Sequence, residues 1–251
     1  MRVLGGAIDL VRPEEVLRFT GERIAAGRKA IVANHNLHSL RLLRCDPAMQ
    51  AFYECADLIE ADSRPLLWWA QAMGHPARGV HRCTYLDWRG AFWAQAAAEN
   101  WRVFFVGGAP GVAERAKAAI ADRWPAASLS VHHGYFDRRP GSAETEAVLE
   151  AITAFRPDVL FVGMGMPLQE TWLLDNYDRL PPCVMFPLGG AFDYEAGVQR
   201  PCPRWLGRMG LEWFYRLAHD PRRLFHRYCV EPVHLIGPAL ADLRERLLRR
   251  V

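Results

Sequence analysis

The feature that most constrains the fold is a regular alternation of short, largely apolar runs with stretches of helical pattern. The runs span 30–33, 56–61, 103–106, 129–132, 158–162 and 184–188. Most are apolar at successive positions, as in parallel strands that are buried on both faces. Helical patterns lie between and beside them at 37–43, 65–73, 111–123, 143–155 and 169–177. This alternation predicts an α/β fold: a Rossmann-like, mostly parallel sheet with helices on both faces.

Polar or glycine-rich clusters follow the predicted strands. They are Asn34-His35-Asn36, Asp62-Ser63, Gly107-Gly108, Gly134-Tyr135, Gly163-Met164-Gly165 and Gly189-Gly190. Right-handed crossovers place the carboxyl ends of parallel strands along one edge, where open α/β sheets bind their ligands. We therefore expect these clusters to form one composite site.

The pattern changes near Pro203. Helical stretches follow at 211–218, 222–228 and 239–250, broken by Pro221, Pro232 and Pro238, so we expect a catalytic core over 1–202 and a basic helical appendage over 203–251. From position 200 onward arginines outnumber acidic residues: Arg200, Arg204, Arg208, Arg216, Arg222, Arg223, Arg227, Arg244, Arg246, Arg249 and Arg250. This excess predicts contact with phosphate groups or an anionic membrane surface.

Composition excludes several other classes. The net charge of +3 is too small to indicate a nucleic-acid partner. There is no signal-peptide pattern and no run of about 20 apolar residues, so we expect a cytoplasmic protein that contacts the membrane only peripherally, at its inner face. The six cysteines form no CxxC pair, which predicts reduced, mostly buried thiols. The histidines lack regular metal-ligand spacing, so we expect no metal site.

Two glycine segments could approach a ligand closely. Residues 104–111 place Gly107 and Gly108 before a helix, where backbone N–H groups can bind phosphate. That segment is neither a GxGxxG fingerprint nor a P-loop, and a tight strand–helix turn is the alternative. Residues 162–172 place Gln169 and Glu170 in the first turn of a helix, in position to bind ribose or uracil. The alternative there is a capped helix with solvated polar groups.

Several of these segments together resemble the WecG/TagA/CpsF family, glycosyltransferase family 26. The strongest matches are 162–172, 189–197 and 210–228, and weaker ones at 36–40, 61–62, 82–87 and 134–136 follow in family order. The resemblance covers roughly 30–230. It implies an inverting, metal-independent enzyme without a cofactor. Such enzymes transfer N-acetylmannosamine, its uronic acid or glucose from a UDP-sugar to a polyprenyl-diphosphate-linked saccharide in cell-surface or exopolysaccharide synthesis. Family members occur as monomers or homo-oligomers.

The resemblance assigns the catalytic base to Asp62. Inversion needs a carboxylate that takes the proton of the acceptor hydroxyl as its oxygen attacks the anomeric carbon. The alternative is that Asp62 caps the following helix. Family members usually have glycine after this aspartate, where this chain has Ser63, and many have threonine where it has Asn34. The segment 199–202 also departs from the family pattern.

The resemblance also implies roles for further residues. Asn34 and Asn36 would contact substrate hydroxyls, and Arg82 the diphosphate. Contacts to the nucleoside and phosphates are expected from Gly107, Gly108, Gly134, Tyr135, Gly163, Gly165, Gln169, Glu170, Gly189, Gly190 and Asp193. Arg216 and Arg223 would close over the leaving UDP and neutralise its charge. The alternatives are a structural turn at Asp193 and a solvated basic face for the two arginines.

Two other functions are compatible with these patterns. A nucleotide-sugar-binding regulatory module would keep the pocket without turnover, and Ser63 and the altered 199–202 segment motivate that alternative. An NAD-dependent oxidoreductase would use the glycine loops, but the GxGxxG fingerprint and its following acidic residue are missing.

Overall fold

The computed structural model describes residues 1–248, without the side chains of Arg204, Arg208 and Arg223. Arg249, Arg250 and the last part of the helix predicted at 239–250 therefore lie outside the described residues, as does the side chain of the candidate ligand Arg223.

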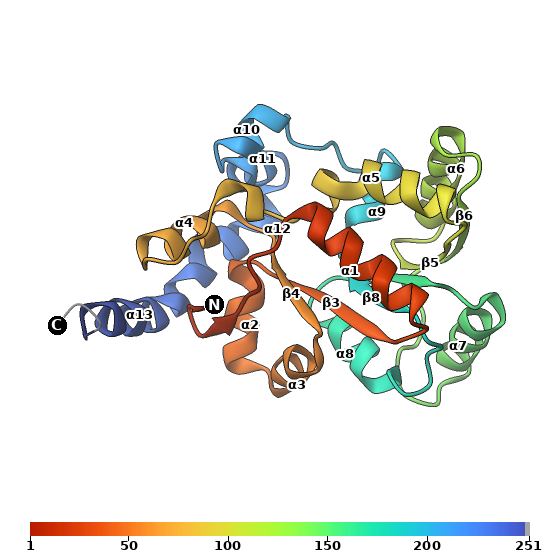
Figure 1. The fold of residues 1–251 in the computed structure, drawn as a ribbon, viewed down its shortest axis with the longest axis horizontal. Coiled ribbons are helices and arrows are strands. Elements are labelled where there is room, and N and C mark those ends of the chain that lie inside the picture. Colours follow the sequence, from red (N-terminus) through yellow and green to blue (C-terminus); the bar gives the residue numbers. More distant parts are fainter. Residues whose placement is uncertain (249–251) are drawn as a thin grey trace.

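A six-stranded parallel sheet forms the centre of the molecule, in the order β4-β3-β8-β7-β5-β6 (Figure 1). The strands are β3 Ala30–His35, β4 Leu58–Ala61, β5 Arg102–Gly107, β6 Ser128–His132, β7 Val159–Gly163 and β8 Val184–Pro187. All six strands predicted from the apolar runs are present, and the predicted α/β fold with a parallel sheet is confirmed.

Helices cover both faces of this sheet. Buried residues of one face pack with α1 Pro13–Ala25, α5 Tyr85–Ala98, α6 Val112–Arg123 and α9 Ala191–Glu195. Those of the other face pack with α2 Leu37–Cys45, α3 Pro47–Cys55, α7 Ala143–Phe155 and α8 Leu168–Asn176. Strand side chains alternate between the faces: Phe104 joins the second cluster, whereas Phe105 joins the first and stacks on Phe192 at 3.7 Å.

Several elements were not predicted. They are the hairpin of β1 Arg2–Val3 and β2 Gly6–Ala7, and the helices α1, α3, α5, α9 and α10. Helix α5 illustrates the reason, because apolar residues occur around most of its circumference and give no helical period. Trp88, Phe92 and Trp93 of this helix are all buried against the sheet. Burial on several sides thus removes the signal that identifies an amphipathic helix.

The C-terminal part is helical from Pro203 onward, with α10 Arg204–Arg208, α11 Glu212–His219, α12 Pro221–Phe225 and α13 Ile236–Leu248. A π-helical turn, His226–Val230, and a 3₁₀ turn, Glu231–Leu235, join α12 to α13. The α-helix is interrupted between Phe225 and Ile236, in agreement with the break predicted at Pro232. The break predicted at Pro238 is wrong, because this proline lies in the first turn of α13, where a helix tolerates a missing N–H.

Helix α13 packs back against the N-terminal residues and α4 Arg64–Ala72. The Asp242 carboxylate accepts hydrogen bonds from the backbone N–H of Leu4 and from Trp69 Nε1, both at 2.8 Å. Leu235 is buried with Leu66 in the same small core. Figure 1 shows the start of α13 close to the N-terminus at this side of the molecule. Within 1–248, no helix combines the length and hydropathy needed to cross a bilayer.

Candidate active site

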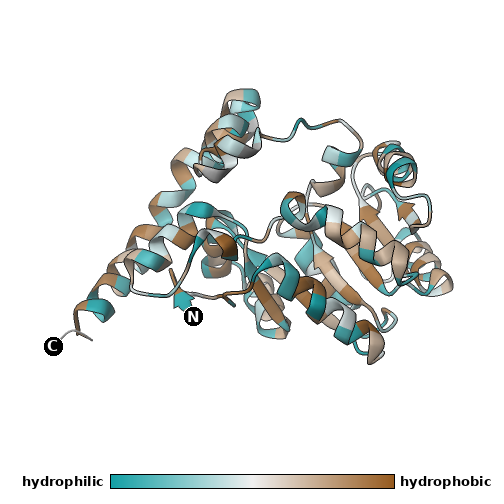
Figure 2. Cartoon of the chain, turned by 45° about the horizontal axis from the view of Figure 1, so that its top comes forward, coloured by the Kyte–Doolittle hydropathy of each residue, from teal (hydrophilic) through white to brown (hydrophobic). Residues whose placement is uncertain are grey.

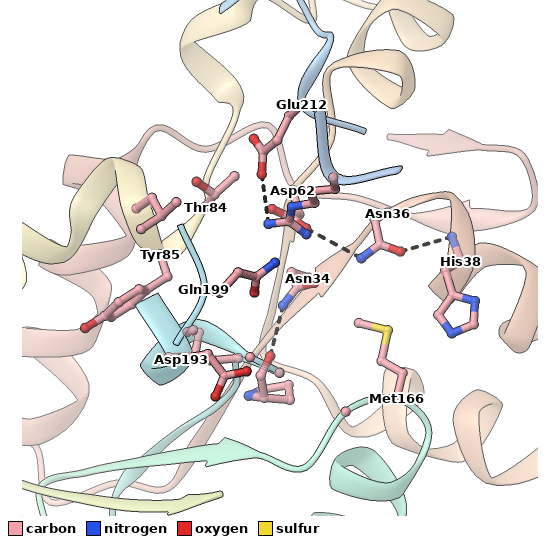
Figure 3. A pocket seen from close by; sticks show the side chains of 18 of the residues that line it. Asn34, Asn36, His38, Asp62, Thr84, Tyr85, Met166, Asp193, Gln199 and Glu212 are labelled. Carbon is pink, nitrogen blue, oxygen red and sulfur yellow. Dashed lines mark hydrogen bonds and ion pairs between the residues drawn. The ribbon is translucent and has the colours of Figure 1, made fainter. Parts of the chain in front are cut away.

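A cavity of about 430 Å³ opens beyond the carboxyl ends of β3, β4, β7 and β8 (Figure 3). Its walls also include residues of α11 and the segment that follows α12. Predicted site residues that line it are Asn34, Asn36, Asp62, Gly165, Gln169, Gly189, Gly190, Asp193 and Arg216. The edge of the sheet therefore brings together residues that lie far apart in the sequence, as the strand–loop alternation led us to expect.

Two adjacent strands supply amide–carboxylate pairs to one wall of this cavity. In the β3–β4 register Asn34 lies beside Glu60, and both line the cavity. One step further along, Asn36 Nδ2 lies 3.5 Å from Asp62 Oδ2. Because side chains two residues apart point to the same side of a strand, both pairs face the cavity.

Asp62 does not cap the helix that follows it. The N-cap residue of α4 is Ser63, whose side chain makes no cap hydrogen bond, and the backbone N–H of Asp62 donates to His35 O at 2.9 Å. The alternative interpretation of Asp62 as a helix cap is therefore wrong. In Figure 3 its carboxyl group lies between Asn36 and Glu212.

The surroundings of Asp62 favour a carboxyl group that holds its proton more strongly than usual. Burial raises the pKa of Asp62, and the nearby Glu212 carboxylate raises it further. Arg82, Arg216 and the hydrogen bond from Asn36 oppose this rise. A raised pKa brings a carboxylate closer to the range in which it can accept a proton efficiently near neutral pH.

Asn36 has a structural task as well. It is the N-cap of α2, and its Oδ1 accepts hydrogen bonds from the backbone N–H groups of His38 and Ser39 at 3.0 and 3.1 Å. The cap fixes the rotamer of Asn36 and directs its Nδ2 toward Asp62. Asn34 is fixed in a similar way, because its Nδ2 donates to Pro187 O at 3.0 Å.

Gln169 ties two loops of the cavity together. Its Oε1 accepts hydrogen bonds from the backbone N–H of Gly165 at 3.1 Å and of Gly189 at 3.0 Å, and its Nε2 donates to Glu170 at 2.8 Å. The side chain is 1% exposed. Gln169 thus connects the loop after β7 to the loop after β8, and its predicted contact with the nucleoside stays a prediction.

The glycines at the strand ends are in contact with one another. A Cβ on Gly163 would lie 2.6 Å from Gly189 O, and one on Gly107 would lie 2.5 Å from Gly163 O. A Cβ on Gly134 would come within 3.0 Å of Gly107 Cα. At these positions the close approach of neighbouring backbones requires glycine.

Some predicted ligands lie away from this cavity. Its lining does not include Arg82, Gly107, Gly108, Gly134, Tyr135, Gly163 or Glu170. The Tyr135 side chain is 70% exposed, whereas that of Glu170 is fully buried. Burial raises the pKa of Glu170 to about 7. The sequence placed Glu170 correctly in the first turn of α8, but could not show that its side chain faces the interior.

A second cavity of about 230 Å³ adjoins the first. Residues shared by the two linings are Asn36, His38, Asp62, Glu212, Arg216 and Arg227. The second cavity adds Arg64 and Arg82 together with the apolar or aromatic side chains of Leu37, Pro65, Trp213, Tyr228 and Pro232. Asp62 therefore lies where the two cavities meet.

Ion pairs connect the sheet to the C-terminal helices at this point. Glu212 of α11 pairs with Arg82 and, at 2.8 Å, with Arg216. The backbone of Arg82 forms a parallel bridge with Ala61, the last residue of β4. Arg216 Nη2 also donates to Tyr194 Oη at 2.5 Å. These contacts hold Arg216 in place in the lining shared by the two cavities.

Sequence reasoning did not select Glu60, Tyr194, Glu212 or Arg227 as site residues. Tyr194 and Glu212 lie inside the quoted family segments, so their position in those motifs was the available signal. Glu60 is a charged residue inside an otherwise apolar strand, which is itself unusual. Among the residues that the structure describes, no three His, Cys, Asp or Glu side chains gather as a metal site would require.

The sequence is similar to known proteins over most of its length. Residues 1–249 match the family model described as "Glycosyl transferase WecG/TagA/CpsF family". Two Staphylococcus aureus proteins, of strains MW2 and NCTC 8325 / PS 47, are each 29% identical over 206 residues, 78% of this chain and 78% of the relative. Both relatives are named N-acetylglucosaminyldiphosphoundecaprenol N-acetyl-beta-D-mannosaminyltransferase.

Proposed function

The chain belongs to the WecG/TagA/CpsF glycosyltransferase family, and on this premise we propose that it transfers a hexose from a UDP-sugar to a polyprenyl-diphosphate-linked saccharide. Family membership makes it a glycosyltransferase of the UDP-sugar-dependent, hexose-transferring type. The observation that carries the proposal is the position of Asp62, which lines both neighbouring cavities.

The main cavity suits the donor. Its loops after β7 and β8 present glycine backbone next to Gln169 and Asp193, which supports binding of the uridine end there. Arg216 and Arg227, which also line this cavity, can neutralise a diphosphate. A volume of about 430 Å³ falls within the usual size of small-molecule sites.

The second cavity suits the acceptor. It combines arginines, for a diphosphate, with apolar and aromatic side chains, for a sugar ring and the start of a prenyl chain. It also opens beside α11, on which Trp213 and Phe214 are exposed. An acceptor held there would direct its sugar hydroxyl toward Asp62.

The proposed chemistry is a single displacement with inversion. The Asp62 carboxylate takes the proton of the acceptor hydroxyl while that oxygen forms a bond to the anomeric carbon of the donor. The bond from that carbon to the diphosphate breaks at the same time, and UDP leaves with the electron pair. Arginine side chains, rather than a metal ion, then stabilise the charge that develops on UDP.

Transfer of a radiolabelled hexose to a synthetic prenyl-diphosphate-linked N-acetylglucosamine tests this proposal, with a donor screen by mass spectrometry to identify the sugar. We expect product in the presence of EDTA, and about 10²- to 10⁴-fold less with Asp62→Asn. The matched control is Asp122→Asn on the exposed face of α6, which should transfer at the wild-type rate. Equal rates for Asp62→Asn and wild type would remove Asp62 from its proposed role.

The same experiment addresses a function without turnover. A nucleotide-sugar-binding regulatory module would bind UDP in calorimetry and transfer nothing from any donor. Ser63 motivates testing this alternative, because its buried Oγ lies next to the proposed base in the chain and has no hydrogen-bond partner among the described residues.

We further propose that the C-terminal helices, over 203–251, bind an anionic membrane surface. Figure 2 shows hydrophobic residues recurring along these helices. Exposed apolar side chains there are Trp205, Met209, Phe214, Phe225, Val233, Ile236, Leu240, Leu247 and Leu248. Arginines accompany them, a combination typical of interfacial helices.

Co-sedimentation with vesicles tests this membrane contact. The double variant Leu240→Ser and Leu247→Ser should bind phosphatidylglycerol vesicles more weakly than wild type, since each change removes exposed apolar area. Leu168→Ser is the control, because Leu168 is also an exposed leucine but lies on the core, in α8. Equal binding of all three proteins would contradict a membrane role for these helices.

A further inference from the structure

Glu60 is a buried carboxyl group that the proposed transfer does not use. It lies in β4 between Ile59 and Ala61, and only 2% of its surface is exposed. Its Oε2 is inaccessible to solvent and has no hydrogen-bond partner among the described residues. A buried polar atom without a partner lowers stability, so its presence calls for an explanation.

The position of Glu60 supplies that explanation. It lines the main cavity but not the second one, whereas Asp62, two residues later on the same side of the strand, lines both. If Asp62 marks the reaction centre between donor and acceptor, Glu60 lies on the donor's side of it. The adjacent Asn34 directs its Nδ2 to Pro187 O, and Glu60 Oε2 has no hydrogen-bond partner among the described residues.

We propose that Glu60 binds the transferred sugar, with its carboxyl group forming hydrogen bonds to hydroxyl groups of the donor hexose. This inference rests on the proposed function and deepens it by assigning the residue that distinguishes a UDP-hexose from UDP. Bound sugar hydroxyls supply the partner that the protein lacks, and they can both donate to and accept from a carboxyl group.

The charge of the surroundings agrees with this role. Burial raises the pKa of Glu60 well above its ordinary value, and the neighbouring Asp62 raises it further. A neutral carboxyl group can donate one hydrogen bond and accept another, as pairs of sugar hydroxyls require. It also leaves Asp62 as the group that ionises first and serves as base.

Calorimetry on the full-length protein tests the inference. UDP, UDP-glucose and UDP-N-acetylmannosamine are titrated into wild type, Glu60→Gln and Glu60→Met. We expect the affinity for UDP to be unchanged in both variants. Affinity for the UDP-sugar that wild type prefers should fall about tenfold or more in Glu60→Met and less in Glu60→Gln, which keeps hydrogen-bonding atoms.

Deoxy forms of the preferred donor identify the hydroxyl involved. Removing the hydroxyl that Glu60 binds should weaken binding to wild type but cause no further loss in Glu60→Met, because the partner is already gone. A residue that merely supports the fold would show no such coupling. Leu58→Met is the matched control, since Leu58 lies two residues earlier on the same side of β4 and does not line the cavity.

Thermal unfolding gives a second readout: the unfolding temperature should rise in the variant whose affinity for the UDP-sugar falls. Glu60→Met should unfold at a higher temperature than wild type, because it removes a buried group without a partner. Unchanged affinity of Glu60→Met for the UDP-sugar, or a lower unfolding temperature accompanied by loss of UDP binding, would overturn the inference. Failure of wild type to bind any UDP-sugar would instead defeat the proposed function on which it rests.

Discussion

The two halves of the sheet end differently at the cavity. The carboxyl ends of β3 and β4 carry amide and carboxyl side chains that face the cavity, with Asn34 beside Glu60 and Asn36 beside Asp62. The ends of β5 and β7 and the loop after β8 carry glycines instead, whose backbones touch. Both kinds of ending looked like ligand-binding signals in the sequence. The structure indicates that the β3–β4 half offers side chains to the cavity, whereas in the other half the close approach of neighbouring backbones requires glycine at Gly107 and Gly163.

Among variants that test the difference between the two halves, we expect Gly163→Ala to cause the largest loss of stability. The new methyl group would lie 2.6 Å from Gly189 O and 2.7 Å from Phe105, so neighbouring backbone must move. We expect a loss of about 1–3 kcal/mol in the free energy of unfolding, measured by urea denaturation. Full stability with loss of UDP binding would contradict the comparison, because it would make Gly163 a ligand-contact residue.

A matched glycine serves as the control for that variant. Gly90 lies in the exposed part of α5, and a Cβ there would meet no atom within 4 Å. Gly90→Ala should therefore stabilise the protein by about 0.5–1 kcal/mol, since alanine loses less backbone freedom in a helix. The opposite signs of the two alanine variants would show that contact, rather than glycine content, distinguishes these positions.

A smaller effect on stability is expected in the other half. Asn36→Ala removes the N-cap of α2, which costs about 1 kcal/mol in the free energy of unfolding. Asn36→Asp, which keeps a capping oxygen, should recover most of this loss. Recovery without a change in transfer activity would indicate that the amide group facing Asp62 has no part in catalysis.

The pH dependence of transfer tests whether the side chains at the ends of β3 and β4 act on the reaction. In the proposed mechanism Asp62 accepts a proton only when it is ionised, so activity should fall as pH drops through its pKa, which burial raises above the ordinary aspartate value. The Asn36 hydrogen bond lowers this pKa and Glu212 raises it. Asn36→Ala should therefore move the acidic limb of the kcat/KM profile to higher pH, and Glu212→Gln should move it to lower pH. Shifts of the same sign would contradict the assignment of this limb to Asp62.

Much of the fold could be predicted because parallel strands buried on both sides produce continuous apolar runs. Helix α5 could not, since its burial among α1, α9 and the sheet removes the helical period. The composite site was predictable as a place, because strand ends meet at one edge. Its individual contacts were not: Arg82 pairs with Glu212 across 130 positions of the chain, and the cap interpretation of Asp62 failed because the N-cap position of α4 falls on Ser63.

Side-chain direction was the other limit. Glu170 and Gln169 are adjacent in the sequence, yet one faces the interior and the other holds two loops of the cavity. The direction of each depends on how α8 sits against the sheet, and a single sequence does not record that angle. For the same reason the sequence did not show that Glu60, within a largely apolar strand, faces the cavity.

The row of touching glycines has a consequence for how this enzyme could acquire a new substrate. Gly163 lies between Gly107 and Gly189, and Gln169 fastens the neighbouring loops, so mutating one of these positions disturbs the others. A mutagenesis library directed at these glycines and Gln169 should return mostly poorly folded variants. Random substitutions at Asn34, Glu60 and Gln199, which also line the cavity, leave the glycines and Gln169 unchanged. They are the more productive route to an altered choice of donor.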